Sequence, residues 1–254
     1  MSDPRSLQDR VALITGAGAG LGQAYAFLLA ARGAFVVVQD IDRATAEETA
    51  AAIQAKGGQA CACVCDIADP PALGPALRAA GIAPDGIHIL VNNAGIDAAR
   101  TIEQVTVADF DRMFGVHVKG TFFATQTVIG GMKARQGGKI VNISSINGMI
   151  ADSTDSHYNG AKAAILGLTK AWAKEFAPWR INVNAVAPGH VVTAATIARG
   201  SERMERIAKE RIPLGRYANS EEIAHTVAFL ASAESDFITG QVVSPNGGEA
   251  IVGI

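Results

Sequence analysis

The chain has 254 residues, 49% of them hydrophobic, and its 22 basic and 24 acidic side chains leave a formal net charge of −2. This balance argues against the basic stripe of a nucleic-acid-binding protein, so we expect small-molecule partners and no nucleic acid. The polar start lacks the apolar core of a signal peptide, and no apolar run approaches membrane-spanning length. We therefore expect a cytoplasmic protein without a membrane partner. Because no linker-like stretch interrupts the pattern, residues 1–254 are expected to form one α/β domain.

The first motif is a glycine-rich loop between a predicted strand and a predicted helix. The apolar run Val11–Ile14 predicts the strand, and Gln23–Ala31 predicts the helix. Glycine lets the backbone turn sharply and approach a pyrophosphate, while the N–H groups at the helix start attract its charge. The order of strand, loop and helix favours a dinucleotide site formed by Thr15, Gly16, Ala17, Gly18, Ala19, Gly20, Leu21 and Gly22.

The second strand ends in a carboxylate. Ala34–Val38 is a continuous apolar run, typical of a parallel strand covered on both faces, and Asp40 follows it. A carboxylate at this strand tip can accept hydrogen bonds from both ribose hydroxyls of NAD, whereas it would repel the 2′-phosphate of NADP. The next residue, Ile41, is not basic. Either Asp40 or Asp42 can cap the next helix, predicted over Arg43–Lys56; we assign Asp40 to the ribose and Asp42 to the cap.

Three cysteines lie on the third predicted strand. Cys61, Cys63 and Cys65 alternate with other residues, which directs them to one face of the strand. Same-face neighbours on an extended strand are poorly placed to form a disulfide, and no histidine cluster accompanies them for zinc. We expect buried structural thiols and no metal site. After this strand, Asp69 is expected to cap a helix that opens with two prolines.

The fourth predicted strand, Ile87–Val91, leads into the turn Asn92–Gly95. Thr106 and Asp109 then form a capping-box-like start for a long helix that is expected to reach about Met132.

The residues that can carry acid/base chemistry follow the strand Lys139–Ile143. Tyr158 and Lys162 are four residues apart and share one helix face. A phenol titrates near 10, but an ammonium about 4 Å away contributes roughly 4 kcal/mol at an effective dielectric of about 20, enough to lower that pKa by roughly two to three units. Ser145, in the loop after the strand, can donate to the same substrate oxygen. The three residues supply an acid/base group, its activator and an orienting donor.

Together these motifs resemble the short-chain dehydrogenase/reductase family across essentially the whole chain. The last match lies beyond the strand Ile181–Val186. The resemblance implies a single doubly wound parallel sheet with helices on both faces, and hydride transfer on NAD(P). The four matches are Thr15-Gly16-x-x-x-Gly20-x-Gly22, Asn92-Asn93-Ala94-Gly95, Ser145 with Tyr158-x-x-x-Lys162, and Pro188-Gly189 with Thr193.

The resemblance also implies contacts and assembly. Asp66 and Ile67 would touch the adenine, the backbone of Val191 the nicotinamide amide, and Lys162 the ribose. Residues at about 190–213 would form a substrate lid, and a homotetramer would be built on helices 106–132 and 156–177. The implied cofactor-binding set is Gly16, Ala19, Gly20, Leu21, Gly22, Asp40, Ile41, Asp66, Ile67, Asn93, Ala94, Gly95, Tyr158, Lys162, Pro188, Gly189, Val191 and Thr193.

One position departs from the family pattern. Relatives commonly carry Asn-x-x-Gly within the helix that follows Thr106, and this chain has His117-Val-Lys-Gly120. In the family that Asn interrupts the helix, and a carbonyl there holds a water of the proton relay. We expect His117 to join the relay, which predicts an acid-side fall in oxidation rate near 6.5, where an unperturbed histidine titrates. The alternative is a histidine that only packs in the helix.

We expect an NAD(H)-dependent oxidoreductase that interconverts a secondary alcohol and a ketone. One alternative is a 3-oxoacyl-carrier-protein reductase, which the C-terminal third resembles; Asp40 argues against it because those enzymes usually take NADPH. A basic patch on the lid helix could meet an acidic carrier protein, but both charges are mixed there. The other alternative is a regulatory protein that binds the cofactor without turnover. The intact Ser145, Tyr158 and Lys162 argue against it.

Overall fold

The computed structural model describes residues 6–198 and 200–252, which contain a seven-stranded sheet whose paired strands are all parallel. The strand order is β3-β2-β1-β4-β5-β6-β7. The expected doubly wound parallel sheet is therefore confirmed. The strands are β1 (Val11–Thr15), β2 (Phe35–Asp40), β3 (Gln59–Val64), β4 (Ile89–Asn92), β5 (Gly138–Ile143), β6 (Ile181–Val186) and β7 (Val242–Val243).

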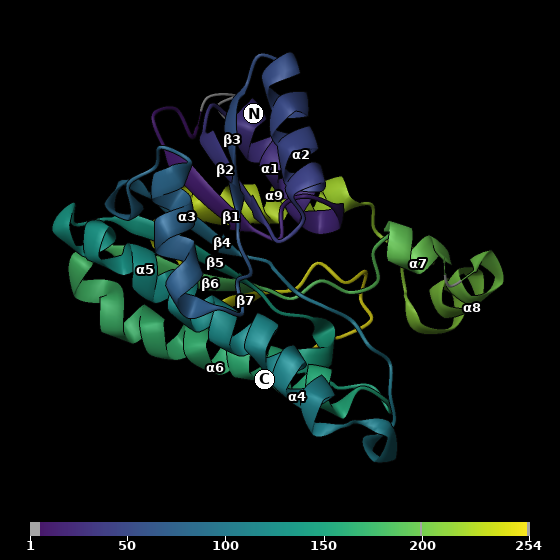
Figure 1. Ribbon diagram of the computed structural model, residues 1–254. Coiled ribbons are helices and arrows are strands. Elements are labelled where there is room, and N and C mark those ends of the chain that lie inside the picture. Colours follow the sequence, from purple (N-terminus) through teal and green to yellow (C-terminus); the bar gives the residue numbers. More distant parts are fainter. Residues whose placement is uncertain (1–5, 199, 253–254) are drawn as a thin grey trace.

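Helices cover both faces of the sheet (Figure 1). One layer holds α1 (Gly20–Ala31), α2 (Arg43–Ala55) and α9 (Ser220–Ala231), and the other holds α3 (Leu73–Ala79), α5 (Gly120–Ala134) and α6 (Ser156–Phe176). Strand residues alternate between the two layers: Val36 and Val38 pack with the first layer, and Val37 with the second. This alternation explains why the apolar run of β2 is continuous rather than interrupted. Short 3-10 turns complete the structure: η1 (Pro70–Ala72), η2 (Pro84–Gly86), η3 (Ile102–Gln104), η5 (Ile146–Gly148), η6 (Ala177–Trp179) and η7 (Ala233–Ser235).

The order of the strands places a crevice beside β1. β1 pairs with β2 on one side and with β4 on the other. The chain runs outward from β1 to β2 and β3 and then crosses back to β4, so the strand order reverses beside β1. In open α/β sheets ligands bind outside the carboxyl ends of the strands at such a switch point. The loops after β1 and β4, which carry Gly16 and Asn93, meet there.

Buried amides tie the two central strands to the helices below them. Asn92 Nδ2 donates to Asn142 Oδ1 at 2.9 Å and to Thr125 Oγ1 at 3.1 Å. Asn142 Nδ2 donates in turn to Thr169 Oγ1 at 2.9 Å. Buried polar groups need such partners, so this ladder fixes β4 and β5 relative to α5 and α6 just before the loops that carry the functional residues.

The expected long helix over 106–132 is present as one helical run over 107–134, but it contains a π turn that the sequence did not predict. The structure has α4 (Val107–Phe114), a π-helical turn η4 (Gly115–Lys119) and then α5. A π turn shifts the bonding by one residue, which leaves no mark on the hydrophobic pattern. The capping box at the start of α4 is confirmed, because the Asp109 amide donates to Thr106 Oγ1 at 3.1 Å and Asp109 Oδ2 accepts from the Thr106 amide at 3.0 Å.

Two further sequence expectations need correction. β3 ends at Val64, and only Cys63 is buried, whereas Cys61 and Cys65 are partly exposed; all three are free thiols. Cys65 lies where the chain leaves the sheet toward the crevice. Asp69 does precede η1, but its side chain makes no capping hydrogen bond.

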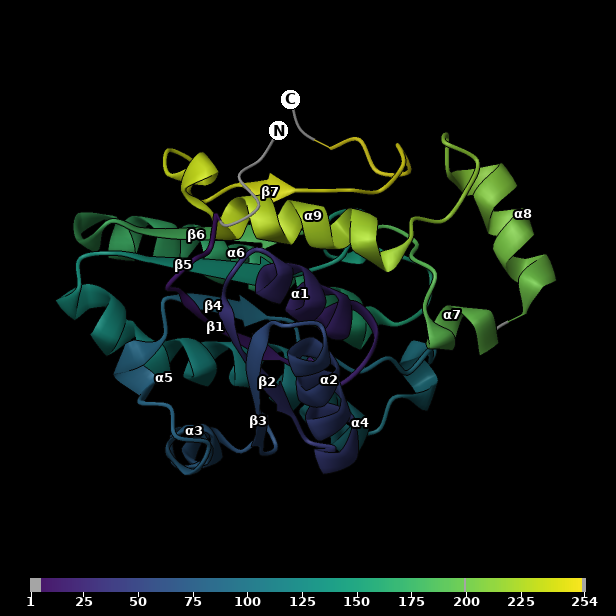
Figure 2. The same ribbon diagram turned by 90° about the horizontal axis from the view of Figure 1, so that it is seen from above.

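The helices α7 (Ala194–Ala198) and α8 (Ser201–Arg211) stand off from the sheet in both views (Figures 1 and 2). Within the described ranges, no helix has the length and apolar character needed to cross a membrane.

Candidate active site

The glycine loop between β1 and α1 has a backbone conformation that residues with a Cβ rarely adopt. Gly16 has φ of 62° and Gly20 has φ of 58°, in the left-handed region that favours glycine. α1 begins at Gly20, and the preceding Ala19 supplies no side-chain cap. The first N–H groups of α1 are thus not bonded to a capping side chain, which suits an anion at the helix start.

Close backbone packing shapes the same loop. A Cβ added to Gly16 would lie 2.8 Å from Ala94 Cα, and one added to Gly22 would meet the Gly16 carbonyl and lie 2.5 Å from Asn93 Nδ2. Any side chain at either glycine would therefore separate the loop from the turn after β4. The cradle fits a dinucleotide that approaches the backbone closely.

Thr15 and Asn93 hold these two segments together. Asn93 Nδ2 donates to the Thr15 carbonyl at 2.8 Å and to the Gly16 carbonyl at 3.0 Å. Thr15 Oγ1 accepts from the amides of Asn93 and Ala94, both at 3.0 Å. The sequence placed Thr15 only within the loop motif. Its positioning role depends on a contact across 78 residues, which no local pattern reveals.

Asp40 lies beside the glycine loop at the end of β2. Its Oδ2 accepts from the Gly18 amide at 2.9 Å, and its Oδ1 accepts from the Asp42 amide at 3.1 Å. Asp42 caps α2, as expected, by accepting from the amides of Ala44 at 2.9 Å and Thr45 at 3.3 Å. The assignment of Asp42 to the helix cap is therefore confirmed, and the assignment of Asp40 to the ribose stays a prediction.

The loop after β3 lies next to Asp40. The Cys65 amide donates to the Asp40 carbonyl at 3.1 Å, and Asp66 Oδ1 accepts from the Ala68 amide at 2.9 Å. Ile67 is buried. Ile41, by contrast, has an exposed side chain.

Gln39, which the sequence analysis did not single out, joins this loop to the glycine loop. Its Oε1 accepts from the Gly16 amide at 3.3 Å, and its Nε2 donates to the Cys65 carbonyl at 2.8 Å.

The candidate acid/base residues lie where the loop after β5 meets the start of α6. Lys162 Nζ donates to the Ile143 carbonyl at 2.9 Å and lies 5.6 Å from the centre of the Tyr158 ring. Burial lowers the pKa of Lys162 to about 8. Ser144 Oγ donates to the Lys162 carbonyl at 2.8 Å, so the loop that carries Ser145 is fastened to the same helix.

Backbone strain marks the loop between Ser145 and α6. Ala151 has φ of 59° and Asp155 has φ of 64°, both unusual for residues with a Cβ. Asp155 is held in this state by Arg100, in the loop after β4: the Asp155 amide donates to the Arg100 carbonyl at 3.0 Å, and Asp155 Oδ1 accepts from the Arg100 amide at 2.8 Å. This pairing fixes the start of α6 three residues before Tyr158.

His117 lies in the π turn with its ring edge-on to Tyr158, the ring centres 5.5 Å apart. Its Nε2 is 2.9 Å from the Ile96 carbonyl oxygen and 3.0 Å from the Ile96 nitrogen, so the tautomer decides which partner it uses. Burial, followed by the nearby Lys162 charge, lowers the pKa of His117 to about 3. The expected titration near 6.5 is therefore wrong, and the imidazole stays neutral at ordinary pH. His117 Nδ1 is buried without a hydrogen-bond partner among the described residues.

The loop after β6 completes the site. The Ile146 amide donates to the Pro188 carbonyl at 3.0 Å, which brings this loop beside Ser145. Val191 is buried, and its carbonyl accepts from Thr196 Oγ1 at 3.0 Å. Thr193 Oγ1 accepts from the Thr196 amide at 3.2 Å, which caps the start of α7.

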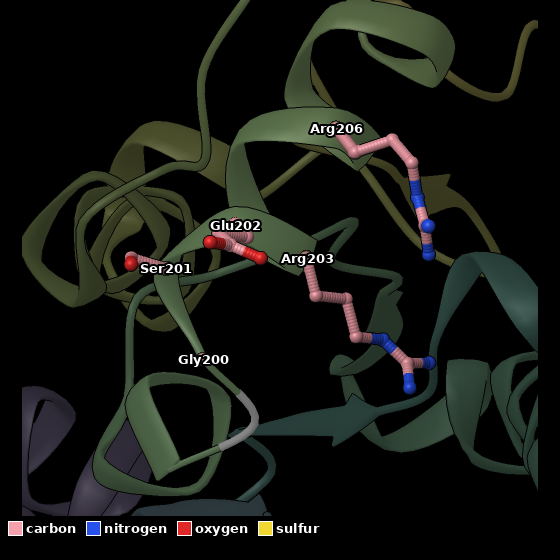
Figure 3. Close-up of a pocket in the computed structure, with 5 residues that line it drawn as sticks. All are labelled: Gly200, Ser201, Glu202, Arg203 and Arg206. Atoms are coloured by element: carbon pink, nitrogen blue, oxygen red, sulfur yellow. The ribbon is translucent and has the colours of Figure 1, made fainter.

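A hollow of about 420 Å³ lies at the start of α8, away from these groups (Figure 3). Arg203 and Arg206 are three residues apart and project from one side of the helix, with Glu202 between Ser201 and Arg203. Among the described residues, the hollow is lined by Gly200 and by residues of α8, and these include none of the candidate acid/base groups.

Comparison with known proteins places the chain among nicotinamide-dependent enzymes. A family model described as enoyl-(acyl carrier protein) reductase matches residues 16–249. The 3-oxoacyl-(acyl-carrier-protein) reductase FabG of Thermotoga maritima is 37% identical over 245 residues, covering 96% of this chain and 99% of the relative.

Two solved structures are similar throughout. One is a 3-oxoacyl-(acyl-carrier protein) reductase of Brucella melitensis with bound NAD, at 32% identity and a TM-score of 0.90, covering 98% of this chain and 95% of the other. The second is a gluconate 5-dehydrogenase of Burkholderia cenocepacia in complex with NADP and tartrate, at 33% identity and a TM-score of 0.90, covering 99% and 100%.

Proposed function

The chain belongs to the short-chain dehydrogenase/reductase family, and from this premise we propose that it oxidises a secondary alcohol with NAD and reduces the matching ketone with NADH. The observation that carries the choice of NAD is Asp40, whose carboxylate accepts from the Gly18 amide at the tip of β2. The two similar structures bind different cofactors, one NAD and the other NADP. The preference must therefore come from residues of this chain.

Asp40 supports NAD by electrostatics. Its carboxylate lies at the tip of β2 beside the glycine loop, where the ribose would follow the pyrophosphate, and a 2′-phosphate there would add like charge at short range. The nearby cation, Arg43, has an exposed side chain and forms an ion pair with Glu47 at 3.0 Å. Initial rates with NAD and NADP at equal concentrations test the proposal. Equal catalytic efficiencies would overturn it.

The geometry around α6 supports the proposed acid/base assignments. When bound, the nicotinamide ring accepts or supplies the hydride. Tyr158 transfers the proton to or from the substrate oxygen, Ser145 donates a hydrogen bond to that oxygen, and Lys162 stabilises the phenolate form of Tyr158 by its charge. The Ile143 carbonyl fixes the Lys162 ammonium, so the charge stays beside the Tyr158 ring.

We propose that His117 joins the proton relay as a neutral imidazole. Its Nε2 is held at Ile96, its ring contacts that of Tyr158, and its buried Nδ1 remains available to a relay partner. A neutral imidazole can donate at one nitrogen and accept at the other, which a relay needs. In the alternative, the ring only packs and a backbone carbonyl of the π turn serves the relay.

The substrate has two candidate classes. Similarity to FabG over 96% of the chain favours a 3-oxoacyl thioester on a carrier protein. Similarity to the gluconate 5-dehydrogenase, together with the charged pair Asp152 and Arg211 near the loop after Ser145, favours a polyhydroxylated substrate. NADH formation with secondary alcohols, sugar acids and hydroxyacyl thioesters separates these classes. Turnover of any of them would exclude a regulatory protein without activity.

The remaining assignments are proposals about organisation. We propose that residues 1–254 form one domain and that residues 194–213, called here the lid segment, cover the substrate. A homotetramer is supported by exposed apolar side chains on α4 and α5, among them Val107, Phe110 and Phe122. A cytoplasmic location is consistent with the free thiols. Sedimentation of the protein as a monomer at micromolar concentration would contradict the tetramer.

A further inference from the structure

A buried carboxylate lies outside the acid/base centre. Glu249, in the segment after β7, has a side chain only 3% exposed. Its Oε2 is 2.7 Å from His190 Nδ1, and its Oε1 is 2.9 Å from Arg211 Nε. A carboxylate removed from water is costly unless charged or hydrogen-bonding partners compensate it. The two partners, 59 and 38 residues earlier in the chain, are the compensation.

The two partners belong to different segments of the chain. His190 directly follows Gly189 in the loop after β6, and its ring centre is 5.0 Å from that of Tyr217. Arg211 is the last residue of α8, at the far end of the lid segment. Glu249 therefore joins the loop expected to meet the nicotinamide to the helix expected to cover the substrate.

Arg211 extends the connection to a third segment. Its NH1 is 3.5 Å from Asp152 Oδ2, in the strained loop after Ser145. The Asp152 carbonyl accepts from Asn159 Nδ2 at 3.0 Å, and Asn159 is the residue next to Tyr158. Arg211 thus contacts two carboxylates: it donates a hydrogen bond to the more exposed Asp152, and it forms a shorter ion pair with the buried Glu249.

The backbone around Glu249 is shaped to reach the end of the lid segment. Gly247 has φ of 66° and Gly248 has φ of 90°, and an added Cβ would lie 2.7 Å from Ile212 Cγ2 and 3.0 Å from Pro213 Cγ respectively. The Leu214 amide donates to the Gly247 carbonyl at 3.0 Å. The two glycines thus let the C-terminal segment lie directly against the point where the lid segment rejoins the body.

We propose that Glu249 is a positioning residue that couples the lid segment to the loop after β6, which is expected to meet the nicotinamide. It holds Arg211 and His190 together, so the order that a nucleotide imposes on residues 188–193 passes to α8. The inference rests on the proposed role of residues 194–213 as the lid. Its consequence is that nucleotide binding protects the lid segment from proteolysis, and that this protection depends on the Glu249 carboxylate.

Limited trypsin digestion tests the coupling, because Arg203, Arg206 and Lys209 offer cleavage sites within α8. In the wild type we expect nucleotide to slow cleavage there at least fivefold. Glu249→Gln keeps the volume but removes the charge. We expect the nucleotide-free variant to be cleaved faster than the nucleotide-free wild type, and we expect nucleotide to slow cleavage of the variant less than twofold. The same digestion with NADPH separates the coupling proposal from the proposed preference for NAD. If only NADPH protected the lid segment, the preference for NAD would be rejected, and the effect of Glu249→Gln on the protection would still test the coupling.

A surface pair supplies the matched control. Glu221 Oε1 lies 4.0 Å from His225 Nε2, and both side chains are largely exposed. Glu221→Gln should leave cleavage and protection unchanged. Glu249→Gln with wild-type protection, or a wild type that neither nucleotide protects, would overturn the coupling.

Arg211→Lys guards against a folding defect, because the side chain is 36% exposed and the charge is kept. We expect it to lose most of the protection, since the single nitrogen of lysine cannot replace a guanidinium whose Nε lies at Glu249 and whose NH1 lies at Asp152. Combined with Glu249→Gln it should do no further harm, because both changes break one connection. Additive losses in the double variant, or full protection in Arg211→Lys, would reject the role of the pair.

Discussion

The Gly18 amide donates to Asp40 Oδ2 at 2.9 Å, so the carboxylate at the tip of β2 is fastened to the loop expected to hold the pyrophosphate. Its second oxygen accepts from the Asp42 amide at 3.1 Å. With one backbone donor on each oxygen, the carboxylate cannot turn away from a phosphate on the ribose. The same bonds orient both oxygens for hydroxyl donors, and this is the basis of the expected preference for NAD.

Replacing Asp40 should change the cofactor preference. Asp40→Ser together with Ile41→Arg removes the like charge and adds a cation beside the site of the 2′-phosphate. We expect the ratio of kcat/KM for NAD to that for NADP to fall at least tenfold, which corresponds to about 1.4 kcal/mol. Steady-state rates with both cofactors measure it.

Asp42→Ser is the control for that change. Asp42 lies two residues away and caps α2. Serine is also a good cap, so stability should change by less than about 1 kcal/mol and the cofactor ratio should stay as it is. If Asp42→Ser shifted the ratio as much as the double variant, Asp40 would not be the selecting residue.

Tyr158→Phe should remove turnover and leave nucleotide binding. The ring remains while the transferable proton is lost, so we expect kcat to fall at least a hundredfold with the NADH dissociation constant changed less than threefold. Tyr25→Phe is a matched control, because the Tyr25 hydroxyl is buried with no hydrogen-bond partner among the described residues. That change should leave kcat unaltered. If Tyr158→Phe kept more than a tenth of the wild-type activity, Tyr158 would not be the general acid/base.

The sequence predicts those parts of the site that depend on local order along the chain. The glycine loop, the carboxylate after β2 and the pair Tyr158 and Lys162 each follow a strand or share a helix turn, so spacing alone brings their groups to one edge of the sheet. The structure has the glycine loop after β1, Asp40 at the end of β2, and Tyr158 and Lys162 on α6, while their roles stay predictions. The cap at Asp42 follows from the same local rules.

What the sequence does not predict depends on distant approach or on burial. Glu249 and His190 are 59 residues apart, and both lie in loops, where no hydrophobic periodicity predicts their contact. The π turn at His117 changes hydrogen bonding without changing the apolar pattern. The neutral state of His117 follows from its burial, since the residue is only 2% exposed, and from the nearby charge of Lys162. A sequence motif shows neither the burial nor the nearby charge.

Lys162 should make stability depend on pH on the alkaline side. Its pKa is about 8 in the folded protein against an ordinary lysine value of 10.5 in the unfolded chain, so between these values the unfolded chain binds more protons. Stability contributed by this group is therefore lowest below pH 8 and rises by on the order of 3 kcal/mol toward pH 10.5. In urea unfolding from pH 7.5 to 10, Lys162→Met should lose this rise. Lys170→Met, at an exposed position of the same helix, should keep it.

His117→Asn separates participation of the imidazole from packing. Because the pKa of His117 is about 3, its titration cannot produce an acid limb near pH 6.5, and the substitution should leave any such limb where it is. If the neutral ring carries a proton, the variant should lose at least threefold in kcat at every pH from 6 to 9, with a larger solvent isotope effect on oxidation. NADH binding serves as the control, because His117 contacts Ile96, next to the turn Asn92–Gly95, and an unchanged NADH dissociation constant shows that this turn keeps its place. Wild-type rates and isotope effects, measured where hydride transfer limits turnover, would show that the ring only packs and that the backbone of the π turn serves the relay. A shift of the acid limb would instead show that His117 titrates far above 3 in the working enzyme, against the burial that the structure gives it.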